Sequence, residues 1–71
     1  MSSFKEIEKS IYEFVCESVK VGEKIELEDF YDKIFEELKY IPDHVDLCFS
    51  RLVSNGMFKK IGMGTNYIRL K

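Results

Sequence analysis

The stretch that decides the fold is residues 45–62, which read VDLCFSRLVSNGMFKKIG. Apolar residues recur in it at helical spacing as far as Ser54, and Gly56 then offers the left-handed conformation that ends many helices. The side chains that this helix is predicted to bury are Val45, Cys48, Phe49, Leu52 and, at its edge, Val53. The sequence therefore predicts a helix that passes through a glycine into a basic strand.

The residues that follow predict a β-hairpin. Residues 57–61 form one strand, the glycine-bearing residues 62–65 form a turn, and residues 66–70 form the returning strand. We expect Phe58, Ile68 and Leu70 to share the inward face, with Lys59 and Arg69 facing solvent. Because a two-stranded hairpin is marginal alone, it must pack on the helices or pair with residues 25–27 as a third strand.

The region before residue 45 predicts two more helices. Ser3 with Glu6 resembles a capping box, and an amphipathic helix of about sixteen residues follows and ends near Gly22. Its predicted inward face is Phe4, Ile7, Ile11, Phe14, Val15 and Ser18, with Tyr12, Cys16 and Val19 on the shoulder. Its predicted solvent face is Lys5, Glu6, Glu8, Lys9, Glu13 and Glu17. Residues 24–28 alternate charged and apolar side chains, as a short edge strand does.

A second helix then starts at a carboxylate, Glu28 or Asp29, and ends near Tyr40. Its predicted buried stripe is Phe30, Tyr31, Ile34, Phe35 and Leu38. Pro42 fits the first turn of the third helix, where Asp43 and Asp46 are expected to supply capping carboxylates.

Composition limits the class of protein. The 71 residues predict one domain, residues 1–71, and 45% of them are apolar, so disorder is disfavoured. Apolar runs do not exceed three residues, against about 20 for a membrane span. Cys16 and Cys48 make neither a disulfide scaffold nor a metal motif, so we expect a cytoplasmic protein in a reducing compartment.

Charge is distributed unevenly along the chain, although the net charge is only −2. Residues 1–46 carry all 13 acids with six lysines, whereas residues 47–71 carry five cations and no acid. Such asymmetry points to polyanion contact or self-association. We expect folding to gather the late cations into one patch, apart from the early acids.

The order helix, short strand, helix, proline-marked turn, helix, glycine and basic hairpin resembles the winged helix-turn-helix family over residues 4–70. Residues 45–62 are similar to that family's recognition helix and to the segment that leads from this helix into the β-hairpin, called the wing. Residues 67–70 are similar to the returning strand of the wing. The resemblance implies an α+β fold, a three-helix core with a two- or three-stranded antiparallel wing. Small members resemble archaeal and viral transcription regulators, whereas others are protein-docking modules, including the C-terminal domains of minichromosome maintenance helicases.

Double-stranded DNA is the partner that the resemblance implies, with the third helix in the major groove and the hairpin on the backbone or minor groove. The predicted contacts are Leu47, Ser50, Arg51 and Ser54 on the helix, and Lys59, Lys60, Arg69 and Lys71 on and after the hairpin. Arg51 can hydrogen-bond to guanine, and Leu47 can contact a thymine methyl group. The cations of the hairpin can neutralise phosphates. Asp43 and Asp46 oppose this function, because carboxylates repel phosphates.

Two other interpretations stay open. The acidic first and second helices suit docking onto a basic protein, and a homodimer bordered by Tyr12, Cys16 and Val19 would read a symmetric site. Neither a catalytic residue set nor a phosphate-binding loop is visible, and His44 is the only histidine. We therefore expect no enzyme activity, cofactor, metal or small-molecule substrate.

Overall fold

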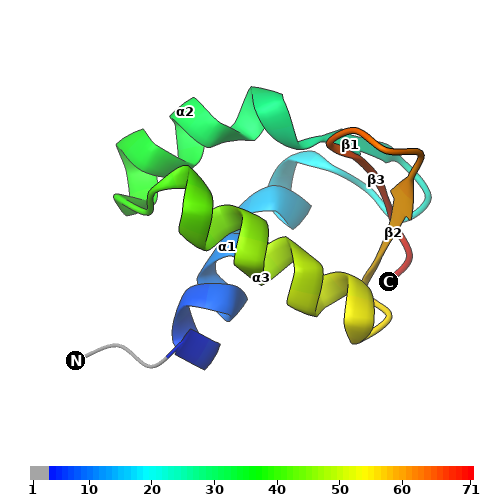
Figure 1. Ribbon diagram of the computed structural model, residues 1–71, viewed down its shortest axis with the longest axis horizontal. Coiled ribbons are helices and arrows are strands. Elements are labelled where there is room, and N and C mark those ends of the chain that lie inside the picture. The colour runs from blue at the N-terminus through cyan, green and yellow to red at the C-terminus, as the bar shows by residue number, and fades with distance from the viewer. Residues whose placement is uncertain (1–3) are drawn as a thin grey trace.

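The computed structural model describes residues 4–71, and Ser3 of the expected capping box lies outside them. The elements are α1 (Phe4–Ser18), β1 (Lys24–Glu26), α2 (Leu27–Leu38), α3 (Pro42–Ser54), β2 (Phe58–Ile61) and β3 (Asn66–Arg69). The three helices pack together, and the strands form a small antiparallel sheet at one end of them (Figure 1). This α+β architecture is compatible with a winged helix.

The sheet has the order β1-β3-β2, so β3 lies in the centre. Ile25 of β1 and Lys60 of β2 are both paired with Tyr67 of β3. Of the two alternatives for the hairpin, the structure shows pairing with a third strand, although β1 is shorter than the predicted residues 24–28. It stops at Glu26 because the next residue begins α2, where the Leu27 N–H donates a hydrogen bond to the Thr65 carbonyl at 2.9 Å.

The core lies where the three helices meet the inner face of the sheet. The Phe49 ring lies 5.1 Å from the Phe58 ring and 5.0 Å from the Tyr67 ring, centroid to centroid. These aromatic contacts join α3 to both strands of the hairpin and fix the direction in which the hairpin leaves α3. The buried apolar residues are Ile11, Val15, Val19, Ile25, Leu27, Phe30, Ile34, Val45, Cys48, Phe49, Leu52, Phe58 and Tyr67.

The predicted inward face of the returning strand is wrong. Tyr67 is buried, Ile68 is only half-buried and Leu70 is 44% exposed. Because side chains alternate along a strand, placing Tyr67 inward also turns Arg69 inward and Ile68 outward. Tyr67 takes the core position because its ring packs on Phe49 while its phenol stays at the edge of the core.

Three predictions for the first two helices also need correction. Phe35 of α2 is 51% exposed, although it was predicted to be buried. Leu27, one residue before the predicted start of this helix, is buried instead. Glu8, assigned to the solvent face of α1, is buried at 7% exposure, whereas Ser18 of the predicted inward face is exposed. The pattern of buried residues predicted for α3 is confirmed.

Candidate nucleic-acid interface

The outer face of α3, defined as Leu47, Ser50, Arg51 and Ser54, is exposed as predicted. The helix begins at Pro42, whose missing N–H needs no partner in a first turn, and Gly56 follows its end at φ +80°. Ile41 occupies the N-cap position without a side-chain hydrogen bond, and Asp46 accepts a hydrogen bond from Tyr31 instead of capping the helix. Asp43 lies in the first turn, where its negative charge suits the start of a helix. Leu47 is 53% exposed, a large apolar side chain in the middle of this face.

The hairpin, defined as β2, residues 62–65 and β3, carries Lys59 and Lys60 on opposite faces. Lys60 is paired with inward-facing Tyr67, and Lys59 is paired with Ile68 on the outer face of the sheet. Gly62 turns the chain at φ +67°, and Met63 at the tip is 99% exposed. The hydrogen bond from Leu27 to Thr65 anchors the returning side of the turn to the start of α2.

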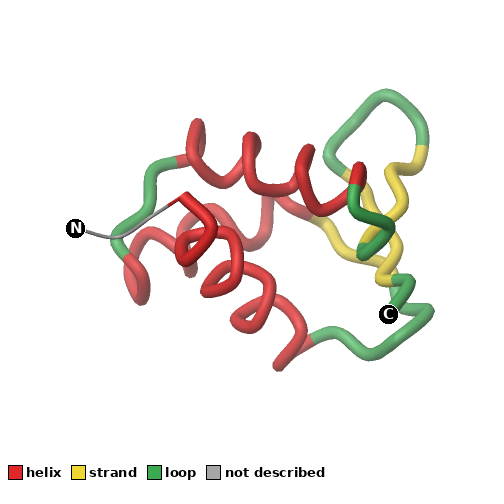
Figure 2. The backbone as a smooth tube through the Cα atoms, turned by 90° about the horizontal axis from the view of Figure 1, so that it is seen from below, coloured by secondary structure: helices red, strands yellow, loops and turns green. Residues whose placement is uncertain are grey.

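An open groove of about 330 Å³, here called the α3–hairpin groove, separates α3 from the hairpin. Its lining residues are Tyr31, Asp46, Ser50, Lys60, Met63, Gly64, Thr65 and Tyr67. Figure 2 shows α3 and the turn of the hairpin along the same upper side of the molecule, with α1 and α2 below them. Ser50 of α3 and Lys60 of β2 therefore border one concave surface.

A hydrogen bond between two helices fixes one wall of this groove, because the Tyr31 hydroxyl of α2 donates to the Asp46 carboxylate of α3. Burial, this hydrogen bond and the charge of Asp46 all raise the pKa of Tyr31 above its ordinary value of 10.0. Burial and the charge of Asp46 likewise raise the pKa of Tyr67. Both phenols remain protonated donors at neutral pH.

We expect the protein to lose stability at alkaline pH. A raised pKa means that the fold favours the neutral phenol, so this contribution is complete below the ordinary pKa of 10.0 and is lost as the pH rises above it. Urea unfolding at about pH 9 and about pH 11 measures the loss, the two values lying either side of the ordinary tyrosine pKa. Tyr31→Phe should reduce the difference, and an unchanged difference would contradict the assignment to Tyr31.

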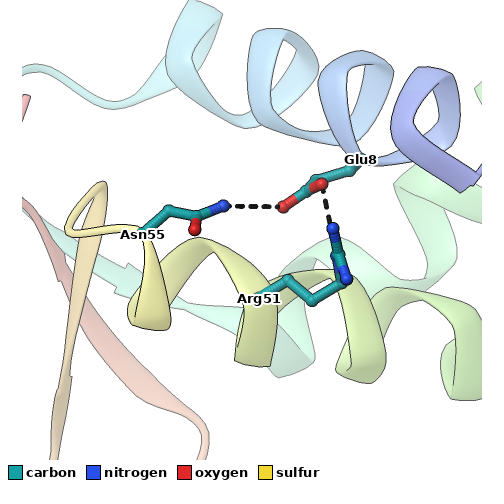
Figure 3. Close-up of polar contacts among 3 residues, drawn as sticks. All are labelled: Glu8, Arg51 and Asn55. Atoms are coloured by element: carbon teal, nitrogen blue, oxygen red, sulfur yellow. Dashed lines mark hydrogen bonds and ion pairs between the residues drawn. The ribbon is translucent and has the colours of Figure 1, made fainter.

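Arg51 lies in a polar cluster between α1 and α3, drawn in Figure 3. Its Nε donates to Glu8 at 3.4 Å, and Asn55 Nδ2 donates to the other oxygen of the same carboxylate at 3.4 Å. The Arg51 side chain is nevertheless 53% exposed, whereas that of Glu8 is 9% exposed. Arg51 therefore stays at the surface, but a buried carboxylate offsets its charge.

Arg69 is a correction to the predicted DNA contacts. Its Nη1 donates to the carbonyls of Val19 at 2.5 Å and Cys16 at 3.3 Å, at the end of α1. Its Nε donates to the Lys71 carbonyl at 2.7 Å. These bonds follow from the inward orientation of β3, and they direct the guanidinium to the end of a helix rather than to phosphates.

Lys71 also lies away from the α3–hairpin groove, because its carbonyl accepts a hydrogen bond from the Tyr12 hydroxyl of α1 at 3.0 Å. The predicted cations thus do not gather into one patch. Lys59 and Lys60 stay on the hairpin, Arg51 pairs with Glu8, the Arg69 guanidinium bonds carbonyls at the end of α1, and the main-chain carbonyl of Lys71 bonds Tyr12 of α1.

The proposed dimer contact also changes. Val19 is buried in the core at 7% exposure, so it cannot border a second subunit. Tyr12 and Cys16 are half-buried, and the Tyr12 hydroxyl is bonded to the Lys71 carbonyl.

Sequence reasoning missed Tyr31 as a member of the site, because aromatic residues at helical spacing indicate a core stripe. The signal was its position at the edge of that stripe, where a phenol can keep its hydroxyl at the surface. Asp46, interpreted as a capping residue, is the partner that this hydroxyl finds.

Comparisons of the chain with protein-family models, with curated proteins and with solved structures return no match. Within residues 4–71, no helix combines the length and the apolar character that crossing a membrane requires. Over the same residues, no three His, Cys, Asp or Glu side chains are grouped so that they could hold a metal ion.

Proposed function

We propose that this chain is a winged-helix domain that contacts duplex DNA with α3 and the hairpin, as a small transcription regulator. The observation that carries the proposal is that α3 and the turn of the hairpin lie along one side of the molecule (Figure 2). Ser50 of α3 and Met63 at the tip of the hairpin also line one groove. An α-helix fits the major groove, and a hairpin beside it reaches the adjacent backbone and minor groove.

Each group of residues has a distinct part in this contact. Lys59 and Lys60 neutralise phosphates, while the hydroxyls of Ser50 and Ser54 donate to phosphates or bases. Leu47 contacts apolar groups such as a thymine methyl. Arg51 adds a contact at the edge of the surface while Glu8 holds its Nε.

Asp46 is the feature that most opposes phosphate contact, and its environment lessens that opposition. The Tyr31 hydroxyl donates to its carboxylate, and Lys60 lines the same groove. A carboxylate held in this way can accept a hydrogen bond from a cytosine amino group in the major groove. Asp46 therefore contributes to the recognition of a base, and it does not contribute to the sequence-independent attraction of the protein to phosphates.

The proposal is tested by mapping the contact on the whole chain. We expect backbone amide signals in NMR spectra to shift on addition of duplex DNA within residues 43–54 and 59–65. Signals from the outer surfaces of α1 and α2 should stay in place. Shifts confined to α1 and α2, or no shifts at all with duplex in excess, would contradict the proposal.

A second candidate function is docking onto a basic protein through α1 and α2. The observation that favours it is on α2, where Phe35 is 51% exposed and Asp32, Glu36 and Glu37 are exposed with it. An apolar side chain within an acidic surface suits a partner with complementary charge. In the same NMR experiment, shifts on α2 with a basic protein and none with duplex would favour docking.

A further inference from the structure

The tip of the hairpin carries an apolar side chain that has no role within the fold. Met63 is 99% exposed, so it contributes nothing to the core. A glycine lies on each side of it, at residues 62 and 64. The tip is therefore slender, with a single flexible apolar side chain at its end and no side chain directly beside it.

The two glycines have different explanations. Gly62 has φ +67°, a conformation that side chains rarely adopt, so the turn itself requires glycine there. Gly64 has no positive φ, and a Cβ added to it would meet only Asn66 Nδ2, at the ordinary contact distance of 3.8 Å. Neither a positive φ nor packing within the protein requires glycine at residue 64, and its missing side chain leaves the tip narrow enough for close approach to another molecule.

The turn of the hairpin is anchored to α2 by a hydrogen bond, and the strand that leads into it carries two lysines. The Leu27 N–H bonds the Thr65 carbonyl at 2.9 Å, so the returning side of the turn is fixed to α2. Lys59 and Lys60 point to opposite faces of β2, because consecutive side chains alternate along a strand. A hairpin that enters the minor groove by its tip would thus present one ammonium group to each of the two phosphate backbones that border the groove.

We infer that Met63 leads the hairpin into the minor groove of duplex DNA and wedges between two stacked base pairs. This inference rests on the proposed function and adds to it a deformation of the DNA. Apolar side chains that enter base steps from the minor groove unstack them and kink the duplex by about 20–90°. Pyrimidine–purine steps such as TA unstack most easily, so the wedge also selects the sequence of the site.

The test uses the whole chain and a short duplex with a central TA step, labelled at both ends for energy transfer. A 2-aminopurine beside the TA step reports unstacking by a rise in fluorescence. We expect the wild type to kink the duplex by at least about 20° and to raise the 2-aminopurine signal. Met63→Ala should bind the same duplex and leave it straight and stacked.

Gly64→Val tests the slender tip separately. Because a Cβ at residue 64 would meet only the side-chain nitrogen of Asn66, at an ordinary contact distance, this variant should fold and melt close to the wild-type temperature, while the added bulk keeps the tip out of the groove and abolishes the kink. Ile61→Ala is the matched control, because it truncates an exposed apolar side chain of the same hairpin away from the tip and should kink DNA as the wild type does.

The outcomes separate the two proposals. A wild type that binds the duplex but leaves it straight, or a Met63→Ala variant that kinks it equally, overturns the wedge and leaves the proposed function standing. A Gly64→Val variant that is folded and still kinks the duplex also overturns the wedge. A wild type that fails to bind duplex DNA overturns the proposed function, and the wedge falls with it.

Discussion

Arg69→Ala should destabilise the folded chain by about 2 kcal/mol, because its guanidinium completes the end of α1. The last carbonyls of a helix have no partner within it, and α1 has no basic residue in its last turn. Arg69 supplies both the missing donors and the missing positive charge, through its bonds to the Cys16 and Val19 carbonyls. Hydrogen bonds to charged groups contribute about 1.5–3 kcal/mol each, reduced here because Arg69 is only half-buried.

Thermal unfolding measures this effect. For a domain of this size each kcal/mol shifts Tm by about 4–8 °C, so we expect Arg69→Ala to lower Tm by about 8–16 °C. Arg69→Lys keeps the charge but loses the separate Nε and Nη1 donors that bond Lys71 and the end of α1, so its Tm should lie between those of the wild type and Arg69→Ala. Lys59→Ala, an exposed control on the neighbouring strand, should stay within about 0.5 kcal/mol of the wild type. If Arg69→Ala melted like the wild type and only weakened DNA binding, Arg69 would face phosphates and our assignment would be wrong.

The helices could be predicted from the sequence because each carries a periodic apolar pattern and a marked end. Pro42 and Gly56 bound α3, and the buried positions between them follow the helical repeat. The hairpin could be predicted from its glycines and from the change to basic and apolar residues. Its pairing with β1 stayed one of two alternatives, because a three-residue strand carries almost no periodic signal.

The orientation of β3 could not be predicted. Tyr67, Ile68, Arg69 and Leu70 offer apolar atoms to both faces of the strand, and a shift of one residue exchanges the faces completely. The contact of Tyr67 with Phe49 decides the orientation, and this contact joins segments that are distant in the sequence. The role of Arg69 at the end of α1 follows from that orientation alone.

The site was predicted in part. The outer face of α3 follows from helical geometry once the core face is known, and the structure exposes all four of its predicted residues. The partners of the charged side chains depend on contacts between elements, so the pairing of Arg51 with Glu8 had no signal in the sequence. The expectation of a single cationic patch is wrong for this reason, and it leaves Lys59 and Lys60 as the principal cations of the proposed interface.

Lys59 and Lys60 are the principal cations of the proposed interface. They should therefore account for most of the salt dependence of DNA binding. Each phosphate contact contributes about 0.9 to the slope of log K against log salt concentration. At 0.1 M salt this corresponds to about eightfold in affinity for each contact, and roughly 60-fold for two. Lys59→Ala/Lys60→Ala should therefore lower the affinity for any duplex by this factor, independent of base sequence.

A matched control removes the same charge elsewhere. Lys9 lies on α1, where it pairs with Glu13, and Lys20 lies in the loop after α1, and both are exposed. Charges away from a contact are screened within about 10 Å at 0.1 M salt. Lys9→Ala/Lys20→Ala should therefore bind duplex DNA within about twofold of the wild type and keep the wild-type slope.

Whether α3 and the hairpin meet DNA is decided by the affinity of these three proteins for one duplex, measured across a series of salt concentrations. We expect the magnitude of the slope of log K against log salt concentration to fall by about 2 for Lys59→Ala/Lys60→Ala and to be unchanged for Lys9→Ala/Lys20→Ala. Equal slopes for all three proteins, or a loss of binding in the control alone, would show that α3 and the hairpin are not the surface that meets DNA.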